Sequence, residues 1–195
     1  MHKNEYRRIR GWDEHKIHVV YAGTFDPRKG GALAAADAAA YLPENYHIHI
    51  LGFGLEADVR NMQEHIANLA KRCSCQITYD GLLSGEDYIQ LIQSCDIGLS
   101  TQNPDAAFNS TSFPSKILSY MANGLRVVSV RIPVVEESAI ARYMYFYDKQ
   151  TPEEIAKAIT AVKMTDDNDA RSAIVELDAK FRMDAQNLIA QIQRT

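Results

Sequence analysis

The 195-residue chain has little cysteine, no excess of basic residues and no long apolar run, and each shortage excludes a class of protein. Cys73 and Cys75 are too close for an ordinary disulfide and Cys95 has no obvious partner, which favours a reduced intracellular setting. With 25 acidic against 21 basic residues, the composition does not favour a nucleic-acid-binding protein. No apolar run approaches the roughly 18–20 residues that span a bilayer. We therefore expect a cytoplasmic protein, peripheral to the inner membrane only if a missing portion contacts it.

Strand patterns and helix patterns alternate along the chain. Short, largely apolar segments, several of them closed by glycine, predict six β-strands at residues 17–22, 46–51, 75–79, 96–100, 125–130 and 143–147. Apolar residues at helical spacing predict helices in the segments between them. This alternation predicts an α/β fold, a Rossmann-like parallel sheet with helices on both faces. We divide the chain into a lead-in segment (1–16), the sheet domain (17–165) and a C-terminal helical tail (166–195).

Residues 108–124 combine a hydroxyl-rich segment with a predicted short helix. Pro114 suits the first turn of a helix, and Asn123-Gly124 suits its end. Free N–H groups at such a helix start, flanked by Ser115 and Lys116, can bind an anion. A capped helix between two loops is the simpler interpretation. Two further helix starts, Ser84 to Asp87 and Thr151 to Glu154, match the capping box.

The carboxyl ends of the predicted strands hold much of the glycine in the chain. Ligands of open parallel sheets bind at this edge. The turns there also carry Arg28, Lys29 and Lys116. Backbone N–H groups combined with several cations suit an anion whose charge is spread over many oxygens, such as a diphosphate. The sequence therefore predicts a site for an anionic ligand at this edge.

These turns resemble the donor-binding domain of group 1 glycosyltransferases of the GT-B fold. The matching segments are residues 23–30 (GTFDPRKG), 51–54 (LGFG), 79–81 (YDG), 96–101 (DIGLST) and, as the most specific match, 113–129 (FPSKILSYMANGLRVVS). The resemblance covers about residues 17–165 in the family's order and spacing. It implies that the chain is one half of a GT-B fold.

The resemblance implies a retaining glycosyltransferase that takes a sugar from a nucleotide-diphosphate donor, UDP- or GDP-linked, to a glycan or other acceptor in polysaccharide biosynthesis. Lys29 matches the family's phosphate-binding lysine, and Arg28 is a candidate second cation; we treat both as catalytic candidates. No metal or other cofactor is expected, because protein cations neutralise the leaving diphosphate. The substrate-binding candidates are Gly23, Thr24, Gly52, Gly54, Asp80, Gly81, Thr111, Ser112, Phe113, Ser115, Lys116 and Ser119.

The chain departs from the family pattern in three ways. Thr24 stands where an arginine usually follows the first glycine. Thr111 and Ser119 stand where the family often has two glutamates, the later of which holds the ribose hydroxyls. The resemblance also implies a second, N-terminal GT-B domain that carries the acceptor site and catalytic groups, and we expect that domain to be missing from this chain. We therefore expect this domain alone to bind donor without transferring sugar.

Two other functions fit the same pattern. A non-catalytic GT-B-like domain could serve in assembly or regulation, and the missing arginine and glutamates favour that interpretation. A sugar-nucleotide epimerase of related fold is the other. His47 and His49 share one face of a predicted strand, a spacing that suits a metal, but packing within the sheet is the interpretation that we adopt.

Overall fold

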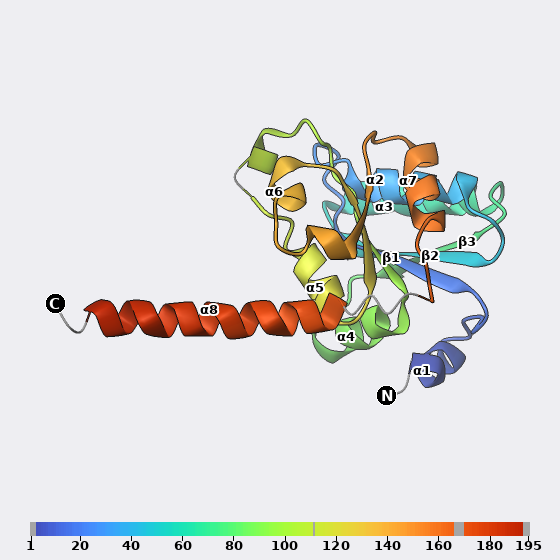
Figure 1. Ribbon diagram of the computed structural model, residues 1–195. Coiled ribbons are helices and arrows are strands. Elements are labelled where there is room, and N and C mark those ends of the chain that lie inside the picture. Colours follow the sequence, from blue (N-terminus) through green and yellow to red (C-terminus); the bar gives the residue numbers. More distant parts are fainter. Residues whose placement is uncertain (1–2, 111, 166–169, 193–195) are drawn as a thin grey trace.

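The computed structural model describes residues 3–110, 112–165 and 170–192 (Figure 1). One six-stranded sheet has the order β3-β2-β1-β4-β5-β6, and all of its neighbouring strands are parallel. The strands are β1 (Ile17–Thr24), β2 (Tyr46–Phe53), β3 (Gln76–Gly81), β4 (Ile97–Ser100), β5 (Arg126–Val130) and β6 (Met144–Tyr147). The predicted Rossmann-like α/β fold is confirmed.

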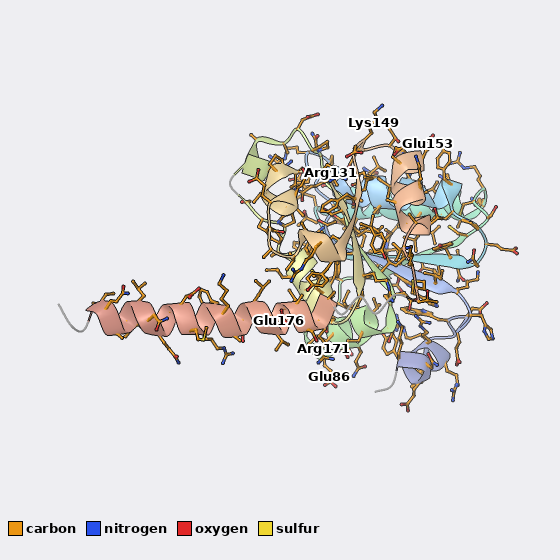
Figure 2. The ribbon with its side chains drawn as sticks, viewed as in Figure 1. Glu86, Arg131, Lys149, Glu153, Arg171 and Glu176 are labelled. Atoms are coloured by element: carbon orange, nitrogen blue, oxygen red, sulfur yellow. The ribbon has the colours of Figure 1, made fainter. Side chains whose placement is uncertain are left out.

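Helices cover both faces of the sheet (Figure 1). On one face lie α2 (Gly31–Asp37), α3 (Glu56–Ala70) and α7 (Pro152–Thr160), and on the other lie α1 (Lys3–Ile9), α4 (Gly85–Ser94) and α5 (Lys116–Ala122). The shorter elements are α6 (Pro133–Glu136), η1 (Ala38–Tyr41), η2 (Ala107–Ser110) and η3 (Ala141–Tyr143). Charged side chains such as Glu86, Lys149 and Glu153 point outward from these layers (Figure 2).

The core consists of strand residues and the helix faces that pack on them. Seven consecutive residues of β2 are buried, as expected for a strand that is covered on both faces. The core also contains three histidines, His18, His47 and His49, each at most 1% exposed. Polar rings in such positions need specific partners, because burying an unpaired polar group costs free energy.

The described part of the lead-in segment packs onto the sheet domain. Arg7 is buried, and its guanidinium Nη2 lies 2.7 Å from Oδ2 of Asp96, directly before β4. Lys3 pairs with the other oxygen of the same carboxylate, and the His18 N–H donates to Asp96 at 2.8 Å. These contacts attach α1 to the amino ends of β1 and β4.

The C-terminal helix α8 (Ala170–Ile192) extends away from the domain (Figure 1). Only its start packs against α5, and only Ala170 and Ala173 are buried in it. Its large exposed apolar residues are Val175, Phe181, Met183, Leu188, Ile189 and Ile192. Among the residues that the structure describes, no helix combines the length and the hydropathy that crossing a bilayer requires.

The helix starts differ in part from the sequence predictions. Thr151 caps α7 as predicted, since its hydroxyl accepts a hydrogen bond from the Glu154 N–H at 3.3 Å. Ser84 occupies the N-cap of α4, but its side chain makes no capping bond, so that capping box is wrong. Helix α5 begins at Lys116 rather than at Pro114, because the Ile117 N–H closes a tight turn onto the Pro114 carbonyl at 3.0 Å.

These two N-caps form a matched pair for measuring stability. We expect Thr151→Ala to lower the free energy of unfolding by about 1 kcal/mol, because it leaves an N–H of α7 without its acceptor. Ser84→Ala should change it by less than about 0.5 kcal/mol, since no such bond is lost. Urea denaturation of the two variants and the unchanged protein measures both values, and equal losses would contradict the assignment of the caps.

Candidate functional site

The strand order reverses between β1 and β4, which are neighbours in the sheet but far apart in sequence. A crevice at the carboxyl ends of the strands forms at such a switch point. Here β1 and β4 pair only through Val19 with Ile97 and Val20 with Gly98. Beyond these pairs β1 stays paired only with β2, as far as Thr24, and β4 only with β5, as far as Ser100, so the space between β1 and β4 opens.

Tyr120 of α5 fills the base of this opening. Its side chain is fully buried and lies over Gly98, where any larger residue would collide with the ring. Its hydroxyl accepts a hydrogen bond from the Ala22 N–H at 2.8 Å. Burial raises the pKa of Tyr120 well above its ordinary value, so the hydroxyl stays neutral. Tyr120 thus closes the base of the opening, and its hydroxyl gives the Ala22 N–H of β1 a hydrogen-bond acceptor.

A cavity of about 260 Å³ occupies the crevice above Tyr120. It is lined by Tyr21, Gly23, Thr24, Lys29, Gly31, Thr101, Gln102, Phe113, Pro114, Ser115 and Lys116. The structure therefore brings together six residues that the sequence singled out, from turns that are far apart in the chain. They are Gly23, Thr24, Lys29, Phe113, Ser115 and Lys116.

Lys116 is the half-buried cation of this cavity. Its Nζ lies 4.0 Å from the centroid of the Tyr21 ring, and a Cβ atom added to Gly23 would come within 2.9 Å of it. Burial lowers the pKa of Lys116 to about 7, and the positive charge of Lys29 acts in the same direction. Among the described residues, neither lysine has a salt-bridge partner. The cavity thus gathers two lysines for which the described part of the chain supplies no carboxylate partner.

Two hydrogen bonds hold the Lys29 turn against the loop after β4. The Thr101 hydroxyl donates to the Gly31 carbonyl at 2.6 Å, and the Asn103 N–H donates to the Lys29 carbonyl at 3.2 Å. Gly31 has no room for a side chain, because a Cβ atom there would collide with the Thr101 carbonyl oxygen. This close approach of two backbones fixes one wall of the cavity.

A second, mainly apolar cavity of about 220 Å³ adjoins the first and shares Gly23 with it. It lies between the ends of β1 and β2, the loop after β3 and the start of α4, and it is lined by Ala22, Gly23, Leu51, Gly52, Phe53, Leu82, Leu83 and Tyr88. Gly52 is one of the predicted site residues. A side chain there would collide with the Gly23 carbonyl oxygen, so glycine lets the two strand ends meet between the cavities.

Other predicted site residues lie outside both cavities. Arg28 is exposed and folds back onto Asp26, two residues before it, with a guanidinium nitrogen 2.8 Å from the carboxylate. Asp80 points instead to the His49 ring, at 3.0 Å. The remaining predicted residues that line neither cavity are Gly54, Gly81, Ser112 and Ser119. Thr111 lies outside the described residues.

Several lining residues were not predicted from the sequence. Thr101 directly follows a predicted strand, so the rule that ligands bind at strand ends could have identified it. Tyr21 falls within the predicted strand at 17–22, and nothing in the sequence indicates that its ring faces a lysine. Leu83 and Tyr88 stand just before and in the first turn of α4, on either side of its N-cap Ser84, so a local apolar pattern could have identified this pair.

The unusual amine of Lys116 can be measured directly. We expect heteronuclear NMR of the lysine side chains to give Lys116 a titration midpoint of about 7. Lys29→Met should raise that midpoint, because it removes the neighbouring positive charge. A midpoint near the ordinary lysine value of about 10.4 would contradict this description of the cavity.

Residues 2–178 match the sequence profile of the family described as Glycosyl transferases group 1. Three solved structures illustrate the fold that the chain shares. Anabaena HepE in complex with UDP and glucose is 18% identical with a TM-score of 0.70, over 95% of this chain and 51% of HepE. Sucrose-phosphate synthase from Thermosynechococcus elongatus is 16% identical with a TM-score of 0.69, over 98% of this chain and 49% of the synthase.

The third structure is the C-terminal domain of a group 1 glycosyl transferase family protein from Francisella tularensis. It is 14% identical with a TM-score of 0.63, over 89% of this chain and 87% of that domain. The chain therefore spans about half the length of HepE and of the synthase, but most of the isolated C-terminal domain. It belongs to the group 1 glycosyltransferase family, and its fold is that of the C-terminal domain of a GT-B enzyme.

Proposed function

We propose that this domain binds the nucleotide-diphosphate sugar of a retaining glycosyltransferase and that the cavity between β1 and β4 holds the diphosphate. The observation that carries the proposal is the convergence of Lys29 and Lys116, without a carboxylate partner among the described residues, on the switch point of the sheet. The acceptor site and the remaining catalytic groups would belong to an N-terminal GT-B domain. A glycan acceptor stays a prediction from the family resemblance, and a cytoplasmic location stays a prediction from the cysteine pattern and the lack of a long apolar run.

A diphosphate complements this cavity electrostatically. In the free protein Lys116 is only partly protonated near neutral pH, because burial disfavours its charge. An anion next to Nζ would favour the charged form and would also relieve the repulsion from Lys29. Each lysine can then make a charge-assisted hydrogen bond to a phosphate oxygen.

The same cations can assist sugar transfer. In a retaining transfer, the bond between the anomeric carbon and the diphosphate oxygen breaks, the acceptor oxygen bonds to that carbon on the same face, and the acceptor hydroxyl proton passes to the leaving diphosphate. Negative charge grows on the leaving diphosphate as the bond breaks. Ammonium groups that are already in place stabilise this charge more in the transition state than in the ground state, which lowers the barrier. We assign this role to Lys29 and Lys116, whereas Arg28 pairs with Asp26 instead.

The apolar cavity next to the lysines suits the nucleoside. Leu83 and Tyr88 offer it apolar and aromatic surface, and Gly23 joins it to the lysine cavity. No carboxylate lines either cavity among the described residues, so neutral groups would have to recognise the ribose. That feature also suits the alternative, a non-catalytic domain. HepE, which shares the fold, has been solved with UDP and with UDP-glucose, which supports starting with uridine nucleotides.

Calorimetry with UDP, GDP and their sugars tests donor binding. We expect the domain to bind at least one of them, and we expect Lys29→Ala and Lys116→Ala each to weaken binding roughly tenfold or more, because each removes a charge-assisted hydrogen bond. Lys71→Ala is the matched control, since Lys71 is an exposed lysine at the end of α3, where the chain leads into the amino end of β3. It should leave the affinity unchanged.

Failure to bind any nucleotide diphosphate, in a domain shown to be folded, would contradict the proposal. Binding without transfer activity in the longer protein would favour the non-catalytic alternative. If the longer protein transfers sugar equally well after both cavity lysines are replaced, the assigned site is wrong.

The lowered pKa of Lys116 predicts how binding depends on pH. Above pH 7 the free amine is mostly neutral, so binding a diphosphate must draw a proton onto it. The affinity should therefore fall from pH 7 to pH 9 by up to about tenfold per pH unit. Calorimetry in buffers of different ionisation enthalpy should show proton uptake on binding. Lys116→Met should abolish this uptake, and a pH-independent affinity in the unchanged protein would contradict the mechanism.

A further inference from the structure

Three buried histidines gather on the face of the sheet that α1 and Trp12 cover. His18 is the second residue of β1, and His47 and His49 belong to the neighbouring strand β2. One ring nitrogen of each lies within 4.8 Å of those of the other two. Trp12 closes the cluster, with its ring stacked 3.8 Å from His49 and 4.9 Å from His18 between centroids. His18 and His47 lie near the amino ends of their strands, away from the edge that holds the lysine cavity.

The outer nitrogens of His18 and His49 face groups that can only accept hydrogen bonds. His18 Nε2 lies 2.9 Å from the Asp13 backbone carbonyl, so it must carry the proton that it donates. His49 Nδ1 lies 3.0 Å from a carboxylate oxygen of Asp80, whose other oxygen lies 3.9 Å from the Arg10 guanidinium. A carboxylate held in an ion pair accepts, so His49 Nδ1 also donates.

The outer nitrogen of His47 is a donor as well. Its Nε2 lies 3.0 Å from the Thr78 hydroxyl oxygen. The single hydroxyl proton of Thr78 is donated to the same oxygen of Asp80, at 3.0 Å. Thr78 can therefore only accept from His47. Asp80 thus orients one ring directly and a second ring through Thr78.

The three inner ring nitrogens, His18 Nδ1, His47 Nδ1 and His49 Nε2, then carry a lone pair and no proton. In its neutral form each of these buried rings has only one N–H, and the outer nitrogen carries it. His18 Nδ1 and His49 Nε2 face each other at 2.9 Å with no proton left to place between them. His47 Nδ1 is buried and has no hydrogen-bond partner among the described residues.

We propose that this histidine cluster binds one divalent transition-metal ion of the zinc type. Three neutral imidazole nitrogens that converge in a buried site are a donor set for such ions. Outer nitrogens that donate to a carboxylate, a carbonyl and a hydroxyl are the orienting partners that metal-bound histidines have in proteins. A cation would replace the contact between lone pairs with bonds and would give His47 Nδ1 a partner.

The fit requires a small rearrangement. Bonds of about 2.0–2.1 Å to a tetrahedral ion place two ligand nitrogens roughly 3.3–3.4 Å apart, so the 2.9 Å contact must open slightly. The His47 and His49 rings, whose centroids lie 3.8 Å apart, must also separate. The sequence pattern alone indicates only His47 and His49, for which packing within the sheet is the simpler interpretation. The position of His18 and the three outer acceptors favour a metal instead.

Such an ion would bind three protein ligands and, because the described residues add no fourth ligand to the cluster, one water molecule. It would join β1, β2 and, through Asp80 and Thr78, β3 beneath the ring of Trp12. The proposal is independent of the donor site, because none of the three histidines lines either of the two cavities there.

The test uses the domain without an affinity tag, stripped with a chelator and titrated with Zn²⁺ or Co²⁺ alone. We expect one ion per chain, a thermal midpoint that rises with Zn²⁺ concentration, and visible absorption of bound Co²⁺ that reports its coordination. The fluorescence of Trp12, the single tryptophan, should change on binding, because its ring stacks on His49.

Variants locate the ion. His18→Gln, His47→Gln and His49→Gln should each weaken metal binding by about tenfold or more, and Asp80→Asn should weaken it by roughly 10–100-fold because it removes an orienting acceptor. His15→Gln, at an exposed histidine just before β1, is the matched control and should bind as the unchanged protein does.

Two results with the unchanged protein would overturn the proposal, and a third would come from the variants. One is a folded, unchanged protein that takes up no stoichiometric Zn²⁺ or Co²⁺, a test that holds even if a histidine variant fails to fold. The other is imidazole ¹⁵N NMR showing a shared proton between His18 and His49 that persists when Zn²⁺ is added. Equal losses in His15→Gln and in the cluster variants would likewise show that the bound ion lies elsewhere.

Discussion

The parting of β1 and β4 beyond Val20 and Gly98 is the constraint on which the candidate site depends. It opens the sheet at its switch point, and the Tyr120 hydroxyl satisfies the Ala22 N–H that faces the opening. Because Tyr120 and Lys116 lie on the same short helix, seating the tyrosine over Gly98 also carries the lysine into the crevice. One packing contact thus sets the floor of the cavity and places its half-buried cation.

The position of Lys116 in the crevice costs free energy in the protein without a ligand. Burial disfavours the charged form of Lys116, and Lys29 repels it. A lysine kept in such a place without a carboxylate partner among the described residues suggests that the compensating charge belongs to a ligand. In the proposed account, a diphosphate both restores the charge of the amine and becomes the group that the amine stabilises when the sugar leaves.

The fold and the cationic half of the site could be predicted from the sequence, because alternating patterns and strand-end turns are local signals. The roles of Arg28 and Asp80 could not. Arg28 forms an ion pair with Asp26, only two residues away. Asp80 lies at an irregular register between β2 and β3, and its carboxylate contacts the His49 ring. The histidine cluster escaped prediction because His18 and Trp12 reach it from segments that only the sheet order brings beside β2. Side-chain direction and long-range strand pairing determine where these residues lie, and neither can be predicted from the local spacing of residues.

The central claim is that the crevice between β1 and β4 holds the donor diphosphate, and a crystal structure of the domain with UDP tests it most directly. The account predicts the β-phosphate in the cavity, within hydrogen-bonding distance of the Nζ atoms of Lys29 and Lys116, and the uracil against Leu83 and Tyr88. UDP bound with its phosphates away from both lysines would contradict it.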